Sequence, residues 1–131
     1  MLLDVQMPPG EFFDKLTILE IKSERIEDPA KLANVRRELD LLRATWAASR
    51  AAAPDVTALV ADLRRVNEAL WDIEDRIRRK EAERRFDDEF IELARSVYRT
   101  NDRRAAIKRS LNLVLESEFL EEKSYTDYGG P

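Results

Sequence analysis

Residues 56–85 read VTALVADLRRVNEALWDIEDRIRRKEAERR and carry apolar side chains three or four positions apart. The recurring positions are Val56, Leu59, Leu63, Val66, Leu70, Ile73 and Ile77. This spacing places them all on one helix face, as in long helices that pack nearly parallel to their neighbours. The sequence therefore predicts an all-α fold, an antiparallel helical bundle arranged around a long central helix at about 56–85.

Turn signals and the same apolar spacing predict about four further helices. Pro8, Pro9 and Gly10 precede the first helix, and Asp28-Pro29 starts the second as an N-cap followed by proline at the first helical position. The predicted helices are 11–27, 29–50, 55–85, 88–100 and 102–115, and residues 116–131 form an extended strap or tail. A chain of 131 residues is the usual size of one domain, so we expect residues 1–131 to form a single helical domain.

Composition narrows the possible functions. The chain contains no cysteine and no histidine, which removes the commonest nucleophile and base pairs, most zinc sites and the di-iron ligands of helical bundles. We predict no catalytic residue, no metal site and no cofactor. The 27 acidic and 23 basic residues nearly balance, so binding to nucleic acid or anionic lipid is not expected.

The expected location is the cytoplasm. No apolar run approaches the ~18 residues needed to cross a bilayer. Residues 1–10 lack the basic and apolar regions of a signal peptide. We therefore expect no membrane contact.

A row of cationic side chains lies along the first predicted helix. Glu11, Lys15, Ile18, Lys22 and Arg25 follow one another at i, i+4, i+7, i+11 and i+14, between two apolar sides of the helix. Apolar residues on two sides predict a helix contacted from two directions. The row has two interpretations: long side chains that pair with carboxylates on the next helix, or an anion site.

A second row lies beside the apolar stripe of the central helix, with Asn67, Trp71, Glu74, Arg78 and Glu81 at the same spacing. An exposed flank rarely needs a tryptophan, so this row is expected to face protein. In antiparallel helices, residues at equal distances from the connecting turn lie opposite each other. Counted in this way, the two rows lie at the same height along the bundle. The predicted ligand-binding residues at this level are Lys15, Lys22, Arg25, Glu38, Asn67, Trp71, Glu74, Arg78, Tyr98 and Arg104.

These residues support two interpretations. In the first, lysines and arginines hold a carboxylate or phosphate between helices, Glu38 and Glu74 fix the donors, and Trp71 and Tyr98 form flat walls. In the second, they form a buried ion-pair network that sets how the helices align, at some cost in stability. The sequence leaves both open.

Four segments carry a resemblance to a known family. They are GEFFDKLTILEIKSERI at 10–26, LWDIEDRIR at 70–78, FIELARSVY at 90–98 and EEKSY at 121–125. The chain resembles, over nearly its whole length, a family of small bacterial proteins known as a domain of unknown function. The resemblance implies an association with glycosyltransferase and cell-envelope sugar genes and brings no activity with it.

The leading functional prediction is a cytoplasmic helical module that binds a small anionic ligand or a protein partner and performs no chemistry. A homodimer is expected, because a helix of about 30 residues is about 45 Å long, more than helices at 88–100 and 102–115 cover. The first alternative is an enzyme that acts by positioning an anionic substrate, as helical chorismate mutases do. The second is a structural adaptor for a glycosyltransferase.

Overall fold

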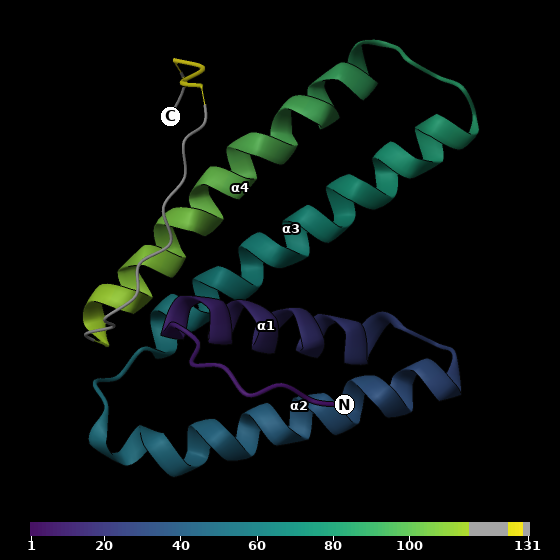
Figure 1. Ribbon diagram of the computed structural model, residues 1–131. Helices are drawn as coiled ribbons and strands as arrows, with labels where there is room; N and C mark the ends of the chain where they lie inside the picture. The colour runs from purple at the N-terminus through teal and green to yellow at the C-terminus, as the bar shows by residue number, and fades with distance from the viewer. Residues whose placement is uncertain (116–125, 130–131) are drawn as a thin grey trace.

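The computed structural model describes residues 1–115 and 126–129, which form helices and loops without a strand. In chain order the elements are α1 (Pro9–Arg25), α2 (Pro29–Ser49), the 3-10 helix η1 (Arg50–Ala52), α3 (Thr57–Ala82) and α4 (Asp88–Val114). Figure 1 shows two helical hairpins, one of α1 and α2 and one of α3 and α4. The all-α prediction is confirmed. Most of the predicted strap, residues 116–125, lies outside the described residues.

The described part of the chain contains four α-helices, so the prediction of five was wrong. The predicted helices 88–100 and 102–115 are one continuous helix, α4. Thr100, the last residue of the predicted helix 88–100, is 1% exposed within α4. The chain has no glycine or proline between 88 and 128 to interrupt it, and residues that favour caps are tolerated inside helices. With 27 residues against the 26 of α3, α4 matches its partner in length, which removes the reason given for a dimer.

α1 is the helix that joins the two hairpins. It packs against α2 on one side and against α3 and α4 on the other, whereas α2 reaches neither α3 nor α4. The prediction that this helix is contacted from two sides is confirmed. The main apolar core follows the same arrangement and consists of Phe13, Leu16, Leu19, Leu39, Val56, Leu63 and Leu111.

The predicted cap at Asp28 is confirmed, and Asp87 caps α4, whereas the N-cap of α3 is Val56, which makes no side-chain cap bond. The Asp28 carboxylate accepts a hydrogen bond from the Lys31 backbone N–H at 3.0 Å, and Asp87 accepts one from the Phe90 N–H at 3.0 Å. Asp87 also pairs with the buried Lys80 ammonium at 2.8 Å, which closes the tip of the α3–α4 hairpin. In the described residues no helix is long and apolar enough to cross a membrane.

Candidate ligand-binding site

A cluster of polar side chains lies where α1, α3 and α4 meet, in addition to the apolar core that these helices share. Asn67 on α3 is 5% exposed, and its Nδ2 donates to Asp14 Oδ1 at 3.0 Å and to Thr17 Oγ1 at 3.0 Å on α1. The Thr17 hydroxyl donates in turn to the Phe13 carbonyl at 2.9 Å. We call this cluster the polar junction; its members are Gly10, Glu11, Asp14, Thr17, Asn67, Arg104, Lys108 and Asn112.

The C-terminal half of α4 supplies the rest of the polar junction. The ammonium of Lys108, a buried residue, lies 2.6 Å from Glu11 Oε1 and 4.0 Å from Asp14 Oδ2. Arg104 Nη1 approaches Asn67 Oδ1 at 3.5 Å, a long and weak hydrogen bond. One ammonium of α4 is thus paired closely with Glu11 and lies at the outer limit of an ion pair with Asp14.

Gly10 lets α1 and α4 approach closely at this point. A Cβ built on it would lie 2.6 Å from the Lys108 carbonyl oxygen and 3.0 Å from Asn112 Oδ1. The N-cap residue Pro8 offers no side-chain hydrogen bond, and the Gly10 N–H instead donates to Asn112 Oδ1 at 2.7 Å. A side chain of α4 thus satisfies the first turn of α1.

In the described residues no buried side-chain nitrogen or oxygen lacks a hydrogen-bond partner. A fully satisfied cluster of this kind fixes the relative placement of the helices that share it. The polar junction therefore matches the register-fixing interpretation of the polar rows. It turns Asp14 and Thr17 toward α3 and leaves Lys15, Ile18 and Lys22 beyond its contacts.

Those three residues line a hollow of about 400 Å³ on α1, which we call the α1 groove. Its complete lining is Met7, Glu11, Asp14, Lys15, Ile18, Leu19, Lys22 and Glu38. Lys15 Nζ lies 2.6 Å from Glu38 Oε1 of α2, so the interpretation of pairing with the next helix holds for Lys15. Lys22 is half-buried, and its ammonium has no carboxylate within 4.0 Å in residues 1–115 and 126–129.

Trp71 marks a second location. The Arg25 guanidinium lies 5.7 Å from the centroid of the Trp71 ring, and its Nη1 lies 2.6 Å from Asp72 Oδ1. Trp71, Glu74 and Arg78 line a hollow of about 230 Å³ on α3. This part of the second polar row faces solvent more than protein, since Glu74 and Arg78 are exposed.

Tyr98 and Arg104 belong to a third location, a hollow of about 510 Å³ between α4 and residues 126–128. The ring of Tyr98 packs against that of Tyr128, with centroids 5.2 Å apart. Burial, followed by a hydrogen bond with Asp102, raises the pKa of Tyr128 above its ordinary value. The ten predicted ligand-binding residues are thus divided among the polar junction and three separate hollows.

Sequence reasoning missed most of the polar junction. Gly10, Asp14, Thr17, Lys108 and Asn112 were not among the predicted site residues, although the first three lie in the motif at 10–26. A small residue and two polar residues on one helix face, at i, i+4 and i+7, were the available signal. The described residues hold no group of three or more acidic side chains that could bind a metal ion.

Comparison with curated proteins and with solved structures found no match. A protein-family model described as a family of unknown function, DUF6165, matches residues 3–129. The match covers all helices and the whole polar junction. The chain therefore belongs to the DUF6165 family of unknown function.

Proposed function

We propose that this chain is a binding module of the bacterial cytoplasm that takes a small anionic group at Lys22 in the α1 groove. The observation that carries the proposal is the position of Lys22, half-buried and without an ion pair in the described residues. A partly desolvated ammonium without a partner is unfavourable. A bound carboxylate or phosphate supplies that partner.

The other charged side chains of the α1 groove all have polar partners, Asp14 through the Asn67 amide as well. Lys15 pairs with Glu38, and Lys108 lies against Glu11 and Asp14. Among the charged residues of the lining, Lys22 alone has no ion pair within the described residues. The groove therefore offers an incoming ligand one ammonium that is not held by a carboxylate.

The shape of the groove favours a small ligand with a neutral or apolar body. Its volume of about 400 Å³ lies within the range of small-molecule sites. Met7, Ile18 and Leu19 provide apolar walls beside the ammonium. Sugar phosphates, nucleotide sugars and dicarboxylates fit this description, and the first two agree with the association implied by the resemblance.

Binding is favoured over a positioning-type enzyme because three other cations, one buried and two nearer the surface, already have partners. Lys108 is held by Glu11, Arg25 by Asp72, and Arg104 contacts Asn67. A chorismate-mutase-like clamp requires such groups for the substrate. Chorismate turnover that is lost in Arg25→Ala would support the enzymatic alternative instead.

A thermal-shift measurement tests the proposal. We expect inorganic phosphate, glucose 1-phosphate, UDP-glucose or succinate to raise the Tm of the wild-type chain in a concentration-dependent manner. The effect should disappear in Lys22→Met, which keeps the apolar stem and removes the charge. Lys31→Met is the matched control, because Lys31 is exposed on α2 and outside the groove. Equal Tm increases in both variants would show that Lys22 is not the contact.

A protein partner is the second candidate function, and the position of α2 favours it. Among the elements that the structure describes, α2 contacts only α1 and the η1 that follows it, and Leu41 on it is 66% exposed. A glycosyltransferase or a second copy of this chain are the partners we propose for this helix. Loss of a wild-type dimer, or of transferase binding, in Leu41→Glu would support this candidate, measured by light scattering and by pull-down.

A further inference from the structure

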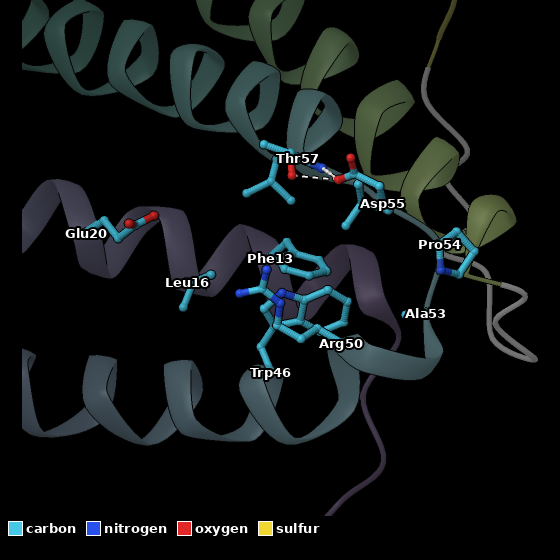
Figure 2. A pocket seen from close by; sticks show the side chains of 11 residues that line it. Phe13, Leu16, Glu20, Trp46, Arg50, Ala53, Pro54, Asp55 and Thr57 are labelled. Carbon is cyan, nitrogen blue, oxygen red and sulfur yellow. Dashed lines mark hydrogen bonds between the residues drawn. The ribbon is translucent and has the colours of Figure 1, made fainter.

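A separate cavity of about 450 Å³ lies on another side of α1 from Lys22. It is open to solvent and bordered by α1, by the end of α2 with η1, and by the start of α3, as Figure 2 shows. Its lining residues are Phe13, Leu16, Glu20, Trp46, Arg50, Ala53, Pro54, Asp55, Val56, Thr57 and Val60. None of these residues lines the α1 groove, and we call this space the Trp46 cavity.

The inner part of the Trp46 cavity is apolar and aromatic. Phe13 is 1% exposed and meets the Trp46 ring edge-on, with centroids 4.9 Å apart and planes at 80°. Leu16 and Val56 are buried beside them. A flat apolar group placed here contacts rigid rings that are held by the core.

The acidic side chains that line the cavity already have ion-pair or hydrogen-bond partners. Glu20 Oε2 lies 3.3 Å from Arg43 and 3.7 Å from Arg64. Asp55 Oδ1 accepts hydrogen bonds from the Thr57 hydroxyl at 2.6 Å and from the Thr57 N–H at 2.9 Å. The Thr57 hydroxyl, then the Thr57 N–H, hold the pKa of Asp55 below its ordinary value.

Arg50 is the exception among the charged residues of the cavity. Its guanidinium has no carboxylate within 4.0 Å in the part of the chain that the structure describes. Arg50 lines the cavity together with Phe13 and Trp46, and all three are drawn in Figure 2. A planar guanidinium matches a carboxylate through two parallel N–H bonds. The cavity therefore combines an aromatic interior with one exposed guanidinium that has no ion pair within 4.0 Å in the described residues, although its charge contributes to lowering the pKa of Asp55.

From this combination we infer that the Trp46 cavity is a second binding site, for an aromatic monocarboxylate. The ring of the ligand lies against Trp46 and Phe13, and its carboxylate accepts from Arg50. Lys22 takes no part, because it belongs to the α1 groove. The inference is independent of the function proposed for Lys22.

Phenylacetate is a suitable probe because it has a single ring and a single carboxylate. The chain contains two tryptophans, so Trp71→Phe leaves Trp46 as the only indole reporter. We expect phenylacetate to change Trp46 fluorescence saturably. Acetate should not do so because it lacks the ring, and phenylacetamide should bind at least about tenfold more weakly because it lacks the charge.

Isothermal titration calorimetry of the wild-type chain provides the same test without the Trp71 substitution. Arg50→Gln should raise the phenylacetate dissociation constant at least about tenfold. Arg37→Gln is the matched control, since Arg37 is exposed on α2 and outside the cavity. Both Arg37→Gln and Lys22→Met should bind as the wild type does. Absence of wild-type binding at millimolar phenylacetate, or equal affinity in Arg50→Gln, would overturn the inference.

Discussion

Gly10→Ala should destabilise this protein, although replacing glycine by alanine in a solvent-exposed helix usually stabilises that helix. Alanine is favoured over glycine in a helix by up to about 1 kcal/mol. At Gly10 the added Cβ would lie 2.6 Å from the Lys108 carbonyl oxygen, where ordinary contact starts at 3.4 Å. The two helices must therefore separate by about 0.8 Å at this point, because the obstructing atom belongs to the backbone of α4.

That separation also affects the hydrogen bond from the Gly10 N–H to Asn112 Oδ1. At 2.7 Å it is a good bond, but 0.8 Å of displacement would bring it to about 3.5 Å, beyond effective range. Overpacking costs about 1–3 kcal/mol, and a buried polar group without its partner costs about 1–3 kcal/mol. After subtracting the helix preference, we expect a net loss of about 2–4 kcal/mol in the free energy of unfolding.

Urea unfolding followed by circular dichroism at 222 nm measures this loss. The corresponding decrease in Tm is roughly 6–16 °C for a chain of this size. Ala33→Gly on the exposed part of α2 serves as calibration, because it reports the helix preference alone. If Gly10→Ala proved neutral or stabilising, α1 and α4 would not be in close contact and the description of the polar junction would be wrong.

Two further substitutions test other parts of the fold. Asn67→Ala should lower the free energy of unfolding by about 2–3 kcal/mol, because it leaves buried partners unsatisfied, whereas Asn34→Ala on the exposed face of α2 should stay within about 0.5 kcal/mol of wild type. Lys80→Met should lower the urea midpoint at pH 7. Lys80 lowers the pKa of Asp87, and Arg76 followed by Lys80 lowers that of Glu89. These carboxylates contribute stability at any pH above their ordinary pKa values of 3.8 and 4.5. The contribution is lost as the pH falls through their lowered pKa values. A hydrogen bond with Asp87 raises the pKa of Lys80 above 10.5. The stability that Lys80 contributes is therefore fully present below pH 10.5 and is lost as the pH rises through the raised pKa. The difference in urea midpoint between Lys80→Met and wild type should therefore shrink at both low and high pH. A difference that does not change with pH would exclude the ion pair as its cause.

The helical class and most helix boundaries could be predicted because local chemistry decides them. Asp28 and Asp87 cap helices through hydrogen bonds to N–H groups three residues later. The break near residue 101 was wrong because Thr100 was read by its local preference alone. In the fold its side chain is buried, and its hydroxyl accepts a hydrogen bond from Arg103 at 3.2 Å. Tertiary packing therefore determined that the helix continues through Thr100, which its local preference alone did not predict.

The composition of the candidate site was harder to predict, because it depends on how whole helices cross. Counting equal distances from turns assumes that neighbouring helices lie along one another. α1 instead crosses the base of the α3–α4 hairpin at an angle, as Figure 1 shows. Asn67 consequently meets Asp14 and Thr17, while the expected neighbour Lys22 lines the α1 groove. Arg25 and Trp71 do meet as the two rows predicted.

The polar junction explains why the two proposed sites can coexist on one helix. α1 carries apolar side chains on more than one side, and apolar packing alone tolerates small rotations of a helix because it is not directional. Hydrogen bonds from Asn67 to Asp14 and Thr17 are directional. A shift of one residue turns a helix by about 100°, which would break both bonds and turn Lys22 and Phe13 away from their present surroundings. The buried polar cluster thus fixes which side chains α1 presents to the α1 groove and which to the Trp46 cavity.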